Sequence, residues 1–204
     1  MGKGDMDHGN MLVAGDALVI VDVQNDFLPG GALAVPNGDA VIEPLNRMIA
    51  HFHQRNLPVI ATRDWHPRNH CSFSERGGPW PPHCVAGTNG AAFAEALRLP
   101  DDALVISKGD DPDADAYSGF QGTDLDARLK RMGVQRLFIG GLATDYCVLH
   151  TALDALEAGF EVIVLHDAVR PVEAHPGDGE RAILRMHEAG AGVLSTETIE
   201  EEMA

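Results

Sequence analysis

Short runs of apolar, β-branched residues alternate along this chain with longer stretches in which apolar residues recur at helical spacing. Such short runs are typical of strands buried on both faces of a parallel sheet. The predicted strands cover residues 17–23, 58–62, 103–107, 136–140, 161–165 and, more weakly, 192–195. The predicted helices cover residues 40–55, 123–132, 144–158 and 179–189. Strands that alternate with helices predict an α/β, Rossmann-like three-layer fold with a six-stranded, mostly parallel sheet.

Two predicted helices have marked ends. Thr123 and Asp126 resemble a capping box, and a glycine follows the last turn; Thr144 opens the next helix. By contrast, residues 64–100 contain only one convincing helical stretch, 89–97. A connection of this length inside a compact domain usually carries function.

Composition indicates one domain. A chain of 204 residues with 45% hydrophobic residues suits a single sizeable core. Residues 1–15 lack any apolar period and are rich in glycine, so we expect a flexible leader followed by one domain over residues 16–204.

The formal charge of −16 opposes binding to nucleic acid or to anionic lipid, which both need a basic surface. A small-molecule substrate, neutral or cationic, is easier to accept. No apolar run approaches the roughly 18 residues of a transmembrane helix, and no secretory signal is visible, so we predict a cytoplasmic protein without membrane contact. Three cysteines, an odd number, are expected to be free thiols.

Candidate chemical groups follow the predicted strands, where open parallel sheets bind their ligands. Cys147 lies in the first turn of the helix that opens at Thr144, where the helix dipole lowers a thiol pKa and backbone N–H groups can face an oxyanion. The alternative is a small apolar core residue. Cys71 and Cys84 lack a predicted helix terminus and are weaker candidates.

Asp22 lies near the end of the first predicted strand, and Lys108 directly follows the third. Burial raises the pKa of a carboxyl group and a nearby cation lowers it, so Asp22 can be poised to take and return a proton. Taken singly, the aspartate is equally a turn cap and the lysine a surface residue. Together with Cys147 they are interpreted as a Cys–Asp–Lys triad.

A metal site is the natural interpretation of Asp64, His66 and His83, which lie in a stretch interrupted by Pro, Gly and Asn. Oxygen and nitrogen ligands suit Zn, Fe(II) or Mn, and three protein ligands leave coordination positions open. The alternative is a solvated loop without a metal.

These motifs resemble, in order, those of nicotinamidases (pyrazinamidases), which belong to the isochorismatase-like cysteine hydrolases. The motifs lie at residues 22–27, 64–67, 80–84, 108–120 and 141–148, and the match runs from about residue 16 to residue 169. The resemblance implies the isochorismatase-like fold and a hydrolase that converts nicotinamide, and also pyrazinamide, to the acid and ammonia.

The resemblance also implies residue roles. Cys147 would attack the carboxamide carbon after Asp22 takes its proton, with Lys108 holding both in place, and a thioester would form. The oxyanion would rest on the N–H groups of Ala143 and Cys147, and the 142–143 peptide bond is cis in the family.

For the metal, Asp64, His66 and His83 match the family's ligands; we expect one divalent ion, zinc first, with iron or manganese as alternatives, bound to the pyridine nitrogen. The aromatic walls that sandwich the ring are matched by Phe27, Trp80 and Tyr117. The role of His70 stays open, because its spacing differs from that of an additional histidine in some relatives. Family members form various homo-oligomers, and the sequence selects none.

Two other functions remain open. One is a metal-free isochorismatase-like hydrolase or N-carbamoyl amidohydrolase, which metal analysis would distinguish. The other is a non-catalytic small-molecule binding protein, although no G-x-G-x-x-G pattern follows the first strand. If no amide releases ammonia, the binding protein becomes the favoured interpretation.

Overall fold

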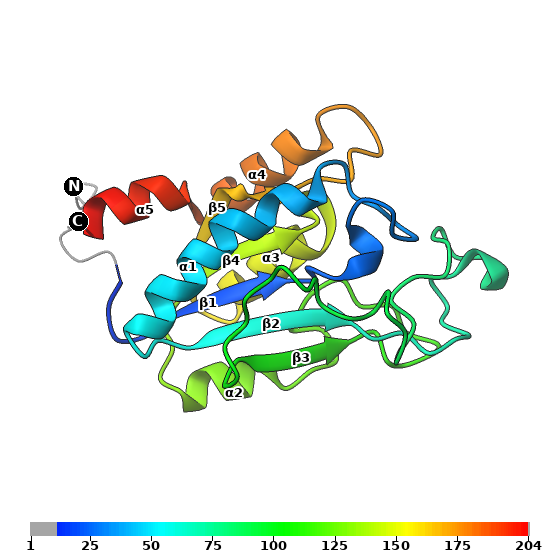
Figure 1. Cartoon of the computed structure of the whole chain (residues 1–204), viewed down its shortest axis with the longest axis horizontal. Helices are drawn as coiled ribbons and strands as arrows, with labels where there is room; N and C mark the ends of the chain where they lie inside the picture. The colour runs from blue at the N-terminus through cyan, green and yellow to red at the C-terminus, as the bar shows by residue number, and fades with distance from the viewer. Residues whose placement is uncertain (1–11, 204) are drawn as a thin grey trace.

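A computed structural model describes residues 12–203 and contains one six-stranded sheet (Figure 1). All five strand pairings are parallel, in the order β3-β2-β1-β4-β5-β6. The strands are β1 (Asp16–Val21), β2 (Val59–Asp64), β3 (Leu104–Lys108), β4 (Arg136–Leu142), β5 (Glu161–Arg170) and β6 (Gly192–Leu194). The predicted α/β fold is confirmed.

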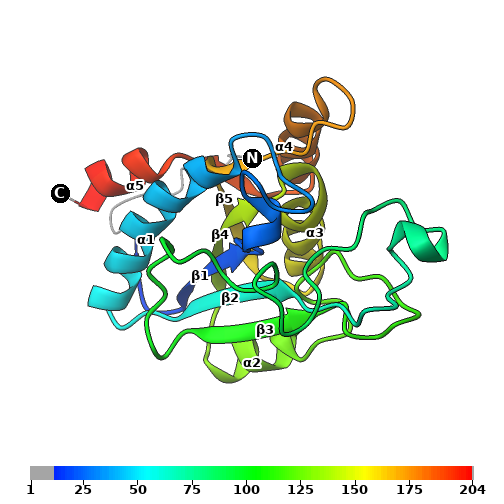
Figure 2. The same cartoon turned by 45° about the vertical axis from the view of Figure 1, so that its right-hand side comes forward.

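Helices cover both faces of the sheet (Figures 1 and 2). α1 (Ile42–Gln54) and α5 (Thr196–Met203) pack on one face. The other face carries α2 (Leu125–Arg131), α3 (Leu149–Glu157) and α4 (Asp178–Glu188). The chain also contains short 3₁₀-helical turns at η1 (Asn25–Phe27), η2 (Gly38–Val41) and η3 (Ser74–Arg76), and a π-helical turn at η4 (Thr144–Val148).

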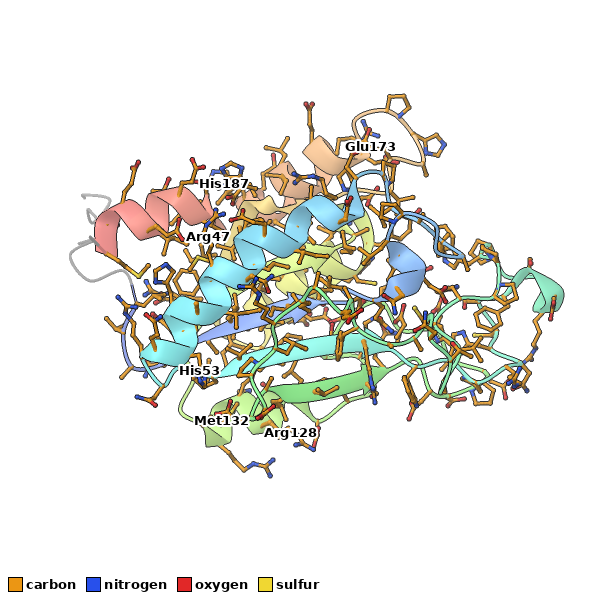
Figure 3. The ribbon with its side chains drawn as sticks, in the orientation of Figure 1. Arg47, His53, Arg128, Met132, Glu173 and His187 are labelled. Carbon is orange, nitrogen blue, oxygen red and sulfur yellow. The ribbon has the colours of Figure 1, made fainter. Side chains whose placement is uncertain are left out.

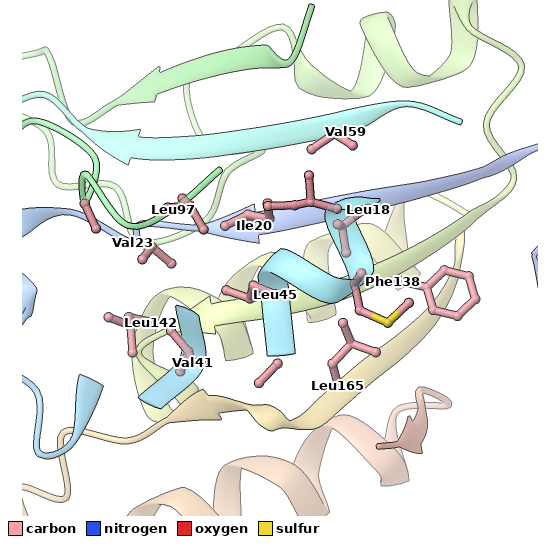
Figure 4. Packing of buried hydrophobic residues seen from close by; sticks show 14 of the residues in the cluster. Leu18, Ile20, Val23, Val41, Leu45, Val59, Leu97, Phe138, Leu142 and Leu165 are labelled. Carbon is pink, nitrogen blue, oxygen red and sulfur yellow. The ribbon is translucent and has the colours of Figure 1, made fainter. Parts of the chain in front are cut away.

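Alternate residues of β1 enter two separate cores. Leu18 and Ile20 face α1, where Figure 4 shows them near Leu45 and Phe138. The intervening residues, such as Val19, face the helices on the opposite side. Because side chains alternate across a strand, burial on both faces requires the continuous apolar run seen in the sequence.

The helix predicted over residues 89–97 is absent; the segment forms turns instead. Its backbone groups bind the chain that leaves β1: Gln24 donates to the Ala91 carbonyl, and the Ala94 N–H donates to the Val23 carbonyl. Gln24 also forms an isolated antiparallel bridge with Phe93. These tertiary hydrogen bonds replace the ones that a helix would have made.

α5 was not predicted. It is short and carries few apolar residues, of which Ile199 is fully buried. Its position is fixed by Arg47 of α1, which donates to Glu200 at 3.1 Å and to Thr196 at 3.0 Å (Figure 3). Such contacts between distant segments leave no local pattern in the sequence.

Most of the predicted leader, residues 1–11, lies outside the described part of the chain. Leu12 is buried against the core on the α1 side. Within residues 12–203, every helix falls short of the length and apolar character that a membrane crossing requires.

Candidate active site

The central strands β1 and β4 are neighbours, and the chain proceeds from them toward opposite edges of the sheet. The crevice outside their carboxyl ends is the switch point at which open parallel sheets bind ligands. Asp22 directly follows β1, and Cys147 lies in η4, a π-helical turn that follows β4. Asp64 and Lys108 are the last residues of β2 and β3. Four strands therefore deliver these groups to one place.

Lys108 connects the predicted catalytic residues. Its Nζ lies 2.9 Å from Asp22 Oδ2 and 3.5 Å from Cys147 Sγ, and it also contacts Asp64 Oδ1. All four side chains are buried. One ammonium group thus contacts two carboxyl groups beside a thiol.

Burial and charge act in opposite directions on these groups. Burial raises the pKa of Asp22, and the Lys108 ammonium lowers it only in part. Burial would lower the pKa of Lys108, but Asp22 and Asp64 together raise it well above its usual value. The lysine therefore stays charged at neutral pH.

The expectation that the helix N-terminus lowers the pKa of Cys147 is wrong for this environment. Burial raises that pKa well above its usual value, and Asp22 and Asp64 add to the effect against the opposing charge of Lys108. The free protein therefore holds a thiol, with a carboxylate beside it that can accept the proton.

Asp64, His66 and His83 meet next to this group. Asp64 Oδ2 lies 3.6 Å from His66 Nε2 and 4.0 Å from His83 Nε2. One ligand atom from each residue lies within 4.8 Å of the others, and all three side chains are buried. The Asp64 carboxylate therefore presents one oxygen to Lys108 and the other to the two imidazoles.

The second nitrogen of each imidazole fixes its tautomer. His66 Nδ1 lies 2.8 Å from the Gly109 carbonyl oxygen, and His83 Nδ1 lies 2.8 Å from that of Pro81. A carbonyl oxygen only accepts, so each Nδ1 carries a proton and each ring turns its Nε2 toward Asp64. This is the arrangement that metal-ligating histidines use. The donor set of two nitrogens and one carboxylate oxygen fits zinc and similar divalent ions.

A pocket opens above Cys147. It is lined mainly by apolar and aromatic side chains, with Asp64, His83 and Cys147 among its lining residues. The predicted walls Phe27, Trp80 and Tyr117 all line it. Trp80 Nε1 donates to the Tyr117 hydroxyl at 3.0 Å, so these two aromatic side chains are tied together at the pocket.

A family model described as the isochorismatase domain matches residues 16–198. The chain belongs to the isochorismatase family. Within this family it is 41% identical over 206 residues to the nicotinamidase of Escherichia coli (strain K12), covering 91% of this chain and 97% of that protein.

Two solved structures agree with this result. A pyrazinamidase of Pyrococcus horikoshii in complex with zinc has a TM-score of 0.85 at 52% identity, covering 89% of this chain and 99% of that one. PnC1 from L. infantum, in complex with nicotinate, has a TM-score of 0.84 at 38% identity, covering 90% and 94%. These relatives confirm the resemblance to nicotinamidases, and this isochorismatase-family chain is a hydrolase that acts on amides.

The structure also accounts for the remaining predicted residues of this isochorismatase-family site. The Leu142–Ala143 peptide bond is cis, and Ala143 lines the pocket beside Cys147. His70 stacks on His66 with ring centroids 4.1 Å apart. Its nitrogens lie 2.7 Å from Ser72 Oγ and 3.2 Å from the Ala114 carbonyl oxygen, so it packs behind His66 rather than facing the pocket.

Sequence reasoning missed Gln24, which is fully buried. Its Nε2 donates to the Asp64 carbonyl at 2.8 Å, and its Oε1 accepts the Asp64 N–H at 2.8 Å. This pair of bonds holds the peptide of a metal-ligand candidate in place. A polar residue directly after an apolar strand was the available signal.

Several pocket residues were also missed. They are aliphatic or aromatic residues that come from loops, from the end of β4 and from η4. They are Leu33, Val35, Leu142, Tyr146 and Val172.

Proposed function

We propose that this chain hydrolyses nicotinamide to nicotinate and ammonia through a thioester on Cys147, and that pyrazinamide is also accepted. The observation that carries the proposal is the buried Lys108 ammonium, which contacts Asp22 and Asp64 beside the Cys147 sulfur at the pocket. The names of the E. coli relative and of the L. infantum complex with nicotinate support the choice of substrate.

The proposed chemistry begins with proton transfer from Cys147 Sγ to Asp22, while the sulfur forms a bond to the carboxamide carbon. The backbone N–H groups of Ala143 and Cys147 hold the oxyanion. Asp22 returns the proton to the departing ammonia, which leaves a thioester. Asp22 then takes a proton from a water molecule as the water oxygen attacks the thioester, and it passes this proton to the departing Cys147 sulfur, which regenerates the thiol and releases nicotinate. Lys108 keeps Asp22 ionised between these steps.

Asp64, His66 and His83 would hold one divalent ion, with zinc first and iron or manganese as alternatives. A metal ion bound there supplies a Lewis-acid contact for the pyridine nitrogen. The zinc in the Pyrococcus horikoshii pyrazinamidase and the Nδ1 contacts that turn Nε2 of both histidines toward Asp64 support this choice. Phe27, Trp80 and the other aromatic residues of the pocket give the flat ring a matching slot.

The test is ammonia release from nicotinamide, pyrazinamide and an N-carbamoyl compound, with metal analysis of the same sample. Cys147→Ala should abolish turnover without loss of fold, whereas Cys71→Ala serves as a matched control and should remain active. Hydrolysis of only the N-carbamoyl compound by metal-free protein would favour the metal-free alternative. No ammonia from any amide would favour the binding protein.

The cytoplasmic location stays a prediction from the sequence, as does the single-domain boundary at residue 16; a homo-oligomer is implied only by the family resemblance, and its subunit number is not selected by the sequence.

A further inference from the structure

The two carboxylate oxygens of Asp22 have different partners. Oδ2 faces Lys108 Nζ at 2.9 Å, and Oδ1 lies 2.7 Å from the hydroxyl oxygen of Thr62. An ionised carboxylate can only accept, so the Thr62 hydroxyl donates its proton to Asp22. The carboxylate is therefore held by a hydrogen bond at Oδ1, whereas at Oδ2 it has only an ion pair.

Thr62 also holds the main chain of Asp22. It lies in β2 opposite Val21, the last residue of β1, and its carbonyl accepts the Asp22 N–H at 3.2 Å. Asp22 has a φ of 50°, outside the strand region, so its side chain leaves the sheet in a direction that β1 alone does not set. Thr62 is the neighbour that supplies both bonds.

The rotamer of Thr62 is fixed by packing. The residue is fully buried, and a Cβ placed on Gly119 would lie 2.9 Å from the Thr62 methyl carbon. The methyl group thus fills the space that a glycine leaves. The Gly119 N–H donates to Thr151 Oγ1 at 3.0 Å, which holds this wall in place. Because a β-branched side chain is stiff at χ1, seating the methyl there directs the hydroxyl at Asp22.

We propose that Thr62 is a positioning residue for the proposed reaction: its hydroxyl orients the Asp22 carboxylate so that this base faces Cys147 Sγ. An oxygen of Asp22 and the Cys147 sulfur lie within 4.8 Å of each other. Proton transfer between them depends steeply on that geometry, since small misplacements of reacting groups cost large factors in rate. The inference rests on the proposed function and assigns it a further residue.

The first test is steady-state hydrolysis of nicotinamide by Thr62→Val, which keeps the shape of the side chain and removes the donor. We expect kcat to fall by about 10- to 100-fold. KM and metal content should stay close to wild type, because Thr62 touches neither the pocket nor the ligand atoms of the histidines. Thr62→Ser, which restores the hydroxyl, should recover most of the lost kcat.

The matched control is Thr196→Val. Thr196 is also fully buried and donates its hydroxyl proton to a carboxylate, that of Asp167, far from the site. Its substitution should leave kcat unchanged. A loss of kcat in Thr196→Val equal to that in Thr62→Val, or a lack of recovery in Thr62→Ser, would overturn the positioning role.

Alkylation of Cys147 by iodoacetamide, followed by peptide mass mapping, provides a measurement that needs no amide substrate. We expect Thr62→Val to slow labelling of Cys147. If loss of the Thr62 hydroxyl only made Asp22 more basic, the thiol proton would be removed faster and labelling would speed up. Slower labelling therefore shows that the Asp22 carboxylate has lost its orientation. Labelling and hydrolysis at wild-type rates would refute the inference.

The same measurement separates the two proposals. If wild type releases no ammonia but Thr62→Val still slows labelling, the proposed function fails and the positioning role stands. If Thr62→Val does not fold, Gly119→Ala carries the test, because its Cβ displaces the Thr62 methyl without removing the hydroxyl. Slower labelling and a lower kcat in that variant support the inference, and wild-type values contradict it.

Discussion

At the scale of single residues, the shared ammonium group of Lys108 has an energetic consequence. Its removal would leave the carboxylates of Asp22 and Asp64 buried without a compensating charge. Burial already raises the pKa of Asp22 in the wild type, where the lysine is present. The folded state of the site therefore depends on this one cation.

We predict that Lys108→Met abolishes turnover and lowers the free energy of unfolding by about 3–5 kcal/mol at pH 7. A carboxyl group whose folded pKa is raised contributes stability below its unfolded pKa and loses that contribution as pH rises through the folded pKa. The deficit of the variant relative to wild type should therefore shrink as the pH falls toward the unfolded value. Urea unfolding at several pH values checks this, and a deficit that grows at acid pH would contradict it.

The metal-site residues lead to a second prediction. Benzamide keeps the carboxamide of nicotinamide but lacks the pyridine nitrogen, so it should be the poorer substrate, with the defect mainly in KM. His83→Ala should lower metal occupancy and erase much of this preference, while Cys147 still reacts with alkylating agents. Steady-state kinetics and metal analysis measure both effects. Equal turnover of the two amides by fully metallated wild type would rule out the anchoring role.

At the scale of elements, the contact of β1 with β4 leaves no room for a side chain at Gly141. This residue has a φ of 120°, and a Cβ there would overlap the carbonyl oxygen of Val21. Gly122 is a matched control, since its φ is also positive, at 70°, but a Cβ added to it would meet no atom within 4 Å.

We therefore predict that Gly141→Ala destabilises the fold by about 4 kcal/mol or more, as expected for a core backbone clash. Gly122→Ala should cost only about 1–2 kcal/mol, the strain of a left-handed backbone. Urea denaturation of the two variants would decide the matter. Similar losses in both would mean that β4 shifts away from β1 to accommodate the methyl group.

Elements also differ in how far the sequence predicted them. β1 and β4 were predicted because residues buried on both faces must be apolar at every position. The prediction of a helix over residues 89–97 was wrong because backbone groups of that segment form hydrogen bonds with Gln24 and its neighbours instead. α5 was missed because its place depends on Arg47, a residue distant in the chain.

The site divides in the same way. Asp22, Lys108 and Cys147 were recognisable because polar and reactive groups stood at the ends of apolar runs. Gln24 forms hydrogen bonds with Asp64, and Thr62 forms one with Asp22. Each pair joins segments that are distant in the chain, so these partners become visible only once the strand order is known. The raised pKa of Cys147 likewise depends on burial and on carboxylates brought from elsewhere.

At the scale of the whole molecule, the net charge of −16 should make stability depend on salt. Self-repulsion of the folded state is screened as ionic strength rises. Surface ion pairs such as Arg128–Asp124 weaken too, but exposed pairs of this kind contribute little to stability.

We predict that the midpoint of thermal unfolding rises by about 2–4 °C between low salt and moderate NaCl, if screening gains about 1 kcal/mol. Differential scanning fluorimetry measures the midpoint, and potassium chloride controls for effects specific to sodium. A midpoint that falls with salt would mean that local ion pairs outweigh the net repulsion.

The strand order β3-β2-β1-β4 has a consequence for how activity appears during refolding. Asp22, Lys108 and Cys147 belong to chain segments that are far apart in sequence and meet only when those strands pair. Closing such long loops costs conformational entropy before the non-local contacts that offset this cost have formed. Local helices can therefore form earlier than the central sheet. Recovery of amide hydrolysis after dilution from denaturant therefore reports completion of that sheet, and it should lag behind the far-ultraviolet signal of the helices.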